Sequence, residues 1–492
     1  MSAPRLAHAV VCASAALSLG AILSCSAVTN VDNAPCTSVD DCRLGFGLGW
    51  TCNSDSGFCE EAEASPLCAA FPDDLLTDRD KYPGDTILFA TLLDGEGDRQ
   101  MVNSANLAVL QVNTVDGGGL EGRKFGMINC TYGDDSNTDD QLAKAREAAR
   151  YAVDAYGVQA IIGPGTSSLA LEVYNEVKDQ VLIISPSATS DTLTYIDGTN
   201  KSAQNPGLFW RSVPPDSGIA ARIADLLISD GRTRVGMIYK DNAYGQNLAD
   251  LLGRSLNPQG LTPPPVELIA YSYDDGTYGD AVVKLSETAD LEEVVFVSDS
   301  ADDVVTFLTS VAGGSGSLAT VGLVFSDSAF SETNVLNKLN ADVITKVIDP
   351  GRARLLVPNA PSGPVFDIFR ENYMKAFDND SPANAGYTAE SYDAAWMAIL
   401  GSAWSLYNED GIKPRGMAAG LHFISDVNAT AFDITPAQWA SIRGSFASGS
   451  AVNIRGASGE LDYDSSTEET TGAVELYAIV NNGGALEYQL IP

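Results

Sequence analysis

Histidine and positively charged side chains are scarce in this sequence of 492 residues. Its only histidines are His8 and His422, which leaves little room for imidazole as a general base or a metal ligand. Lys and Arg total 29 against 65 Asp and Glu, a formal net charge of −36 at pH 7. Because Lys and Arg supply most of the affinity for a phosphate backbone, this balance excludes most nucleic-acid binding. The acid excess suits a calcium site, a cationic ligand or solubility, and solubility is the simplest explanation.

Long apolar runs are also scarce: after residue 30 no stretch is long and apolar enough to cross a bilayer. The run Ala9–Leu23 is short for a membrane span but typical of the core of a signal peptide. It leads into Ile22-Leu23-Ser24-Cys25, which resembles the lipobox of bacterial lipoproteins. The resemblance implies that residues 1–24 are removed and that Cys25 carries lipid, the expected anchor to a membrane. An ordinary secretory signal with a chance cysteine is the alternative.

The expected location follows from this signal. We expect the chain in the cell envelope, lipid-anchored on the extracytoplasmic side. Ser26, and not an acid, follows Cys25, so the lipoprotein resemblance favours the periplasm and the outer membrane.

The cysteine count supports export. Of the eight cysteines, Cys12 belongs to the signal and Cys25 to the lipid anchor, which leaves an even number. Most of the others fall within residues 36–68, a stretch too short to bury much apolar area, so we predict a small disulfide knot. The expected disulfide cysteines are Cys36, Cys42, Cys52, Cys59, Cys68 and Cys130.

We expect two bridges among the first four of these cysteines and a third between Cys68 and Cys130. A zinc site is the alternative, although no histidine accompanies the cysteines. Residues 25–84 are rich in Asp and Glu, and we expect them to form a solvated spacer between the lipid and the first lobe.

From residue 85 onward, apolar runs typical of strands alternate with helical periods. The strand-like runs are Thr86–Leu93, Lys124–Cys130, Val158–Ile162, Val181–Ile184, Arg234–Tyr239, Val266–Tyr271, Glu293–Val297 and Thr320–Phe325. The clearest helix covers Thr138–Tyr156, with a capping-box spacing between Thr138 and Gln141 and with Gly157 at its end. This alternation predicts an α/β fold with two doubly wound, parallel-sheet lobes.

Polar loops follow several of these strands. They are Gly163–Ser168, Ser185–Thr189, Lys240–Gly245, Ser298–Ser300 and Ser326–Ser328. Ligands of open parallel sheets bind at the carboxyl ends of the strands. Hydroxyl groups and glycines at helix starts expose N–H groups that suit a carboxylate, and Asp299 and Asp327 suit a cationic group opposite. Together they describe an amino-acid zwitterion, although each hydroxyl taken alone is more often an ordinary helix cap.

Several motifs in order make the resemblance to one family specific. They are Ala105-Asn106, Asp116–Gly122, Ala160–Pro164, Ile184–Thr189, Leu193-Thr194, Phe209–Asp216, Tyr244-Gly245, Tyr387, Tyr392–Ala394 and Gly456–Gly459. Through them, residues from about Asp85 to Pro492 resemble the branched-chain amino-acid-binding protein family, which has the type I periplasmic solute-binding fold. The resemblance implies a small polar ligand, an amino acid or a related compound, bound between two lobes.

The resemblance also implies ligand-binding residues. They are Glu96, Ser167, Ser187, Ala188, Thr189, Tyr244, Ser298, Asp299 and Asp327. By motif, Ser167 meets the ligand carboxylate, while Ser187 and Thr189, with Ala188 between them, bind through backbone and hydroxyl groups. Tyr244 matches a cleft tyrosine of the second lobe.

The acids of this set leave the charge of the ligand open. Asp327 falls where amino-acid binders keep an acid for the ammonium group, and Ser298 or Asp299 falls where they keep a tyrosine. The first loop departs from the family pattern, and its Glu96 stands near a position that is often aromatic. A cationic or polyamine-like ligand is therefore an alternative to an ordinary amino acid. The other alternative is that Glu96 and Asp299 are surface or capping residues and do not contact the ligand.

The family wiring implies three crossings between the lobes, near Arg211–Asp216, Pro358–Pro364 and Val452–Gly456. Lobe 1 is then expected over residues 85–211 plus 364–451, and lobe 2 over residues 212–358 plus 454–492. Proline and glycine at all three crossings suit a hinge that absorbs backbone rotation.

We expect no catalytic residues, no cofactor and no metal site. The loop Gly163–Ser168 lacks the third glycine of a dinucleotide fingerprint, and the acidic run Asp462–Glu469 lacks the turn glycine of an EF-hand loop. His422 has no serine motif beside it.

Two functions remain open. The first is a monomeric solute-binding lipoprotein that delivers its ligand to an ABC-type permease. The second is a sensory module of the same fold that signals to a receptor.

Overall fold

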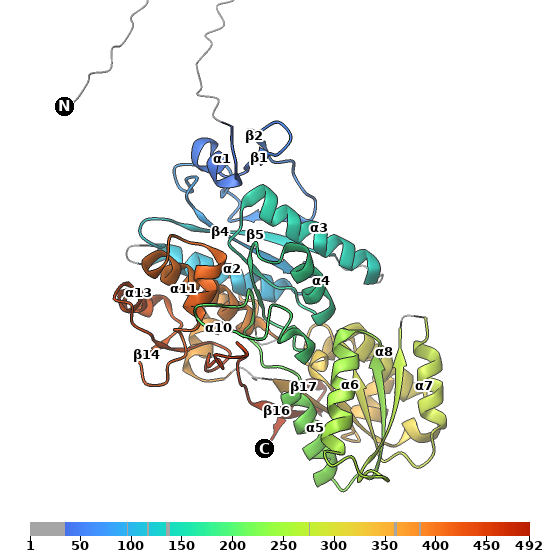
Figure 1. Ribbon diagram of the computed structural model, residues 1–492. Coiled ribbons are helices and arrows are strands. Elements are labelled where there is room, and N and C mark those ends of the chain that lie inside the picture. Colours follow the sequence, from blue (N-terminus) through green and yellow to red (C-terminus); the bar gives the residue numbers. More distant parts are fainter. Residues whose placement is uncertain are drawn as a thin grey trace, which may run out of the picture. The chain divides into compact units, whose positions relative to one another are not determined.

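The computed structural model describes residues 35–95, 97–115, 118–133, 138–274, 276–358, 362–382 and 385–492, and Cys36–Pro492 forms one compact unit. Two β-sheets organise this unit (Figure 1). The first sheet has the strand order β3-β5-β4-β6-β7-β8 and the second β10-β9-β11-β12-β13-β16-β17. We call the parts of the chain packed around them lobe 1 and lobe 2.

The central strands of both sheets are parallel, as predicted. The sheet of lobe 1 consists of β3 (Cys68–Phe71), β4 (Ile87–Leu93), β5 (Phe125–Thr131), β6 (Ala160–Ile162), β7 (Leu182–Ser185) and β8 (Phe209–Arg211). That of lobe 2 consists of β9 (Arg234–Lys240), β10 (Glu267–Tyr273), β11 (Glu293–Val297), β12 (Gly322–Phe325), β13 (Ala353–Pro358), β16 (Val474–Asn482) and β17 (Ala485–Ile491). Antiparallel strands, β3 in lobe 1 and β16 with β17 in lobe 2, complete one edge of each sheet.

Helices cover both faces of each sheet (Figure 1). Those of lobe 1 are α2 (Arg99–Thr114), α3 (Thr138–Tyr156), α4 (Ser167–Val177), α10 (Pro364–Ala376), α11 (Thr388–Asn408), α12 (Pro414–Leu421) and α13 (Trp439–Ala447). Those of lobe 2 are α5 (Ser217–Ser229), α6 (Ala243–Leu256), α7 (Tyr278–Glu287), α8 (Ala301–Gly313) and the short α9 (Ala341–Val343). The bounds of α3 agree with the prediction. None of the described helices is long and apolar enough to cross a membrane.

Strand β4 shows why its apolar run lacks the alternation of a half-buried strand. Phe89 packs into the core beneath α2 and α11, while its neighbours Leu88 and Ala90 pack into the core beneath α3 and α4. All seven residues of the strand are buried. A strand covered on both faces needs apolar side chains at every position.

All six cysteines of the described part are in disulfides: Cys36–Cys52, Cys42–Cys59 and Cys68–Cys130. The first two bridges close a small unit of α1 (Val39–Phe46) and the hairpin of β1 (Trp50–Asn53) and β2 (Phe58–Glu61). The two bridges expected among the first four cysteines, and the third to Cys130, are confirmed. The zinc alternative is wrong, because the cysteines bond to one another.

The expectation of a solvated spacer is wrong over residues 36–84. Strand β3 pairs with β5 in the sheet of lobe 1, and Leu75 and Tyr82 are buried in its core. Arg43 is only 4% exposed and donates hydrogen bonds to the backbone carbonyls of Thr86, Tyr156 and Gly157. The Cys-rich segment is therefore a docked part of lobe 1, because its few apolar and long side chains reach that core.

The third crossing also differs from its expected position. Strand β15 (Asn453–Arg455) pairs with β14 (Ala431–Asp433), and Ile454 and Leu461 lie in the core of lobe 1. Glu468 and Glu469 follow, and both are buried in ion pairs with residues of lobe 1, Lys201 and Arg211. The chain therefore leaves lobe 1 after residue 469, on its way to β16, and not at residues 452–456. The other two connections run from β8 to α5 and from β13 to α10.

The docked N-terminal segment predicts a specific stability effect. Arg43→Ala leaves three backbone carbonyls without this donor, and we expect it to lower the free energy of unfolding by about 2 kcal/mol. Urea denaturation measures the change. Arg79→Ala, at an exposed position of the same segment, is the control and is expected to change stability by less than about 0.5 kcal/mol. Equal effects of the two variants contradict the docking role of Arg43.

Candidate ligand-binding cleft

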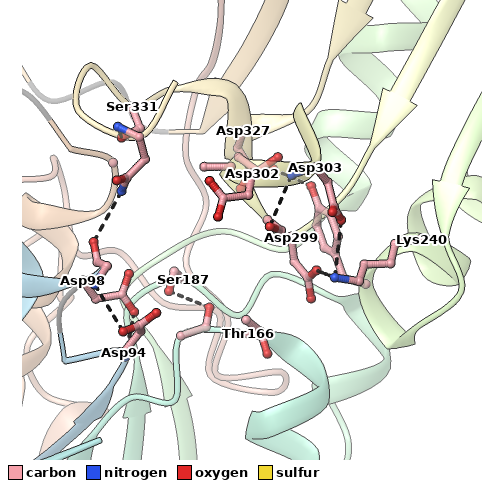
Figure 2. A pocket seen from close by; sticks show the side chains of 18 of the residues that line it. Asp94, Asp98, Thr166, Ser187, Lys240, Asp299, Asp302, Asp303, Asp327 and Ser331 are labelled. Atoms are coloured by element: carbon pink, nitrogen blue, oxygen red, sulfur yellow. Dashed lines mark hydrogen bonds and ion pairs between the residues drawn. The ribbon is translucent and has the colours of Figure 1, made fainter. Parts of the chain in front are cut away.

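A cavity of about 930 Å³ lies where loops at the carboxyl ends of both sheets meet (Figure 2). Lobe 1 contributes the loop after β4, the start of α4 after β6, Ser187 after β7 and Tyr387 before α11. Lobe 2 contributes the loops after β9, β11 and β12. Loops at the carboxyl ends of parallel strands share one edge of a sheet, so both lobes present polar loops to the same space.

The wall formed by lobe 1 is a set of linked hydroxyl loops. The Ser187 hydroxyl donates to the carbonyl of Gly165 over 2.8 Å, and the Ser190 amide donates to the Ser167 hydroxyl over 3.1 Å. Thr166 caps α4 by accepting from the Leu169 amide over 3.4 Å. The first N–H groups of a helix have no partner within it and lie at its positive end. This wall therefore suits a carboxylate.

Asp327 lies on the opposite wall and is 8% exposed. The hydroxyl groups of Tyr244 and Tyr387 both donate to its carboxylate. Burial raises the pKa of Asp327, and the two tyrosine hydrogen bonds oppose that shift. Since Tyr387 precedes α11 of lobe 1 while Asp327 follows β12 of lobe 2, this contact joins the lobes at the edge of the cavity.

A second acid, Asp98, lies between β4 and α2 at another side of the cavity (Figure 2). Its carboxylate accepts hydrogen bonds from the Asp94 amide over 3.0 Å and from the Tyr132 hydroxyl over 3.4 Å. Burial, together with the nearby Asp94 carboxylate, raises the pKa of Asp98 to about 7. A cationic ligand group beside Asp98 relieves both causes.

Further acids of lobe 2 surround two lysines. The Lys240 ammonium lies 3.5 Å from Asp299 and 3.4 Å from Asp303, and Lys338 lies 2.8 Å from Asp302. The aspartates that line the cavity are Asp94, Asp98, Asp299, Asp302, Asp303 and Asp327, against these two lysines. The lining of the cavity is therefore strongly acidic.

Five of the residues implied by the resemblance line the cavity. They are Ser167, Ser187, Tyr244, Asp299 and Asp327. Glu96 lies outside the described residues, as does the lipobox cysteine Cys25.

Three other implied residues lie behind the cavity walls and not among the lining residues. The Ala188 carbonyl accepts from Arg211, and the Thr189 carbonyl accepts from the Asp216 amide. The Ser298 hydroxyl donates to Asp303 over 2.7 Å. These three position the loops, because successive residues of a loop point in different directions and only some reach the cavity.

Other residues line the cavity although the sequence analysis did not predict them as binding residues. They include Asp94, Asp98, Lys240, Asp303 and Tyr387. Lys240 follows strand β9 directly, so its place at a strand end was a usable sign. Asp98 carried another sign, since it directly precedes a helix after a buried strand. Tyr387 was noted only among the motifs of the family resemblance and not as a binding residue, because it reaches the cavity through the packing of α11 within lobe 1.

Direct contacts join the two walls elsewhere. The Ala243 amide donates to the Ser168 hydroxyl over 3.4 Å, and the Ser190 hydroxyl donates to the Ala243 carbonyl over 3.3 Å. On the other side of the cavity, the Asn334 amide group donates to the Gly97 carbonyl over 3.5 Å. Residues of both lobes therefore enclose the cavity.

Comparison with known proteins identifies a family and a related protein. A family model described as a periplasmic binding protein matches residues 93–428. The chain is 25% identical over 362 residues to the chemotactic signal transduction system substrate-binding protein BasB of Halobacterium salinarum, an alignment that covers 72% of this chain and 77% of that protein.

Solved structures show the same fold. The leucine binding protein LivK of Thermotoga maritima has a TM-score of 0.58 at 16% identity and covers 82% of this chain and 98% of its own. A solute binding protein of an ABC transporter from R. palustris, in complex with 4-hydroxybenzoate, has a TM-score of 0.60 at 13% identity and covers 83% and 96%. These likenesses confirm the predicted type I periplasmic-binding fold.

The raised pKa of Asp98 predicts a pH-dependent stability. Its ordinary value near 3.8 applies to the unfolded chain and a value of about 7 to the folded one. The folded state therefore holds this proton more tightly, and stability falls as pH rises from about 4 to 7. Asp98→Asn removes that loss, so we expect it to stabilise the unliganded protein at pH 8 by on the order of 1 kcal/mol and much less at pH 4.5.

Urea denaturation at the two pH values measures this effect. Asp302→Asn is the control, because the Asp302 side chain is 77% exposed and its loss is expected to change stability little at either pH. An equal effect of Asp98→Asn at both pH values contradicts the raised pKa.

Proposed function

This chain belongs to the periplasmic binding protein family, and on that premise we propose that it is an extracytoplasmic solute-binding protein. Its ligand is an amino acid or a similar small polar molecule held in the cavity between the lobes. The proposal is of binding and not of catalysis. His422, the only histidine in the described part, bonds to Glu468 and does not line the cavity.

The opposed chemistry of the two cavity walls carries the proposal. The hydroxyl groups and helix start around Ser167 and Ser187 suit a carboxylate, and Asp327 with its two tyrosines suits an ammonium group. The cavity volume of about 930 Å³ lies in the range of small-molecule pockets, roughly 300–1,000 Å³. A zwitterion that spans the cavity satisfies both walls at once.

Binding by both lobes also explains how a partner protein could detect the ligand. A ligand that touches both walls stabilises the arrangement in which the lobes meet, and this shifts the population of the protein toward that arrangement. A partner that recognises the liganded arrangement then responds to the presence of the ligand. We propose an ABC-type permease as this partner, with the protein acting as a monomer.

A sensory role is the second candidate. The relative BasB is named as part of a chemotactic signal transduction system, which favours a receptor as the partner. Uptake of a radiolabelled ligand by cells that lack this protein distinguishes the two. Lost uptake supports transport, and normal uptake with a lost response to the ligand supports sensing.

We further propose that the mature chain is anchored by lipid on Cys25. Residues 26–35 then separate the lipid from the docked segment that begins at Cys36. Ten residues reach at most about 35 Å when fully extended. Docking of residues 36–84 on lobe 1 thus makes the tether much shorter than the sequence suggested.

A thermal-shift screen tests the binding proposal. We expect at least one amino acid or related small polar compound to stabilise the purified protein by about 2.7 kcal/mol at a hundred times its dissociation constant. Asp327→Asn should reduce the binding free energy of that ligand by about 1–3 kcal/mol, because a charged ligand group loses its partner. Asp280→Asn, at an exposed position of α7 that does not line the cavity, is the control and should bind nearly as wild type. Equal affinity of the ligand for both variants would mean that its binding site does not include Asp327.

Cell fractionation tests the anchor. Cys25→Ser removes the acylated side chain, so we expect the protein to leave the membrane fraction and appear among the soluble proteins. Cys12→Ser is the matched control and should stay with the membrane. Continued membrane association of Cys25→Ser contradicts the lipid anchor.

A further inference from the structure

A buried carboxylate behind the cavity belongs to none of the interactions described so far. Glu390 lies in the first turn of α11 and is 1% exposed. Its Oε2 atom has no hydrogen-bond partner among the described residues. A buried carboxylate without a partner is costly as an ion, and it is stabilised by a cation or by a proton.

Glu390 lines a small second cavity of about 100 Å³, which we call the back pocket. Asp327 and Tyr387 line both the back pocket and the main cavity, so the two cavities adjoin at these residues. One water molecule needs a cavity volume of roughly 10–15 Å³. The back pocket is several times larger, so it has room for the end of an alkyl chain with its ammonium group.

The other walls of the back pocket combine aromatic rings with smaller apolar residues. Phe330, Phe366 and Tyr477 line it together with the ring of Tyr387. Aromatic faces attract cations and also accept the methylene groups that carry an ammonium group. Two carboxylates among aromatic rings therefore suit an alkylammonium group and disfavour an anionic one.

The charge of the main cavity points the same way. Its two lysines, Lys240 and Lys338, are both in ion pairs with aspartates of lobe 2. For Asp98 and Asp327, no ion pair with a Lys or Arg is found in the part of the chain that the structure describes. A cavity of one sign with low-dielectric walls concentrates ligands of the opposite charge.

We propose that the ligand is a linear molecule with two cationic groups, one of which enters the back pocket between Asp327 and Glu390. An α-amino acid with an ammonium side chain and an α,ω-diamine share this chemistry. The first cationic group stays in the main cavity. In the amino acid, the carboxylate faces the start of α4. The inference rests on the proposed function and narrows its ligand class.

Calorimetry with matched pairs of compounds tests the inference on the purified protein. Lysine differs from norleucine only by an ammonium group on the terminal carbon of the side chain, which is a methyl group in norleucine. The pair 1,5-diaminopentane and pentylamine makes the same comparison without a carboxylate. We expect at least one dication to bind at least tenfold more tightly than its matched compound. The dication that binds more tightly shows whether the ligand is an amino acid with an ammonium side chain or a diamine.

Substitutions then place the distal group. Glu390→Gln keeps the shape of the side chain and removes its charge, so we expect it to abolish the tenfold advantage of the dication. The affinities for norleucine and pentylamine should stay within twofold of those of the wild type. Glu409→Gln, just after the same helix and exposed, removes an equal charge and should keep the advantage. Ala385→Leu narrows the back pocket and should also abolish it, which provides a test if Glu390→Gln folds poorly.

Two outcomes overturn the inference. One is that neither lysine nor 1,5-diaminopentane binds more tightly than its matched compound. The other is an advantage that survives both Glu390→Gln and Ala385→Leu. If a neutral amino acid or benzoate binds in the main cavity instead, the inference fails and the proposed function stands. If no small polar compound binds, the proposed function fails as well.

Discussion

The contact of Asp327 with Tyr244 and Tyr387 is the interaction on which the cavity depends. It places a buried carboxylate of lobe 2 under the hydroxyl groups of one tyrosine from each lobe. A carboxylate in this position is expensive to bury unless donors surround it, and the two tyrosines are those donors. Asp327 therefore joins the two lobes through these tyrosines, and it is also the residue that we propose as the partner of a ligand ammonium group.

Buried charges also hold the lobe 1 framework behind this site. Arg211 contacts Glu469 and the carbonyls of Ala188 and Ser190, so the loop after β7 is fixed by a residue at the end of β8. Arg43 ties the disulfide-bonded segment to the same lobe through backbone carbonyls. In a chain with so few cations, each of these arginines satisfies several acceptors at once. Arg211 therefore holds the loop that carries Ser187.

The periodic and buried parts of this fold were predictable from the sequence. Helix α3 and the central strands were found because amphipathic periods and apolar runs report burial directly. The positions of the cavity loops followed from the strand ends, by the general geometry of parallel sheets. Elements that depend on distant partners were not predictable: β3 exists through its pairing with β5, and β15 through its pairing with β14. Helix α11 is buried on nearly all sides, so it has no amphipathic period to detect.

Within the cavity, the sequence predicted the loops better than the side chains that line it. Thr189 and Ser298 lie in the predicted loops but do not line the cavity, whereas Asp98 and Tyr387 line it without having been predicted as binding residues. The direction of a loop side chain depends on backbone geometry that has no period in the sequence. Glu390 lies further still from any sequence pattern, since its position behind Tyr387 depends on how α11 packs.

The central claim is that one small ligand is held by both lobes in the acidic cavity. A crystal structure of the protein with its tightest ligand tests this claim most directly. The account predicts ligand density in contact with Ser187 of lobe 1 and with Asp327 of lobe 2. Density that contacts a single lobe, or that lies outside this cavity, would contradict it.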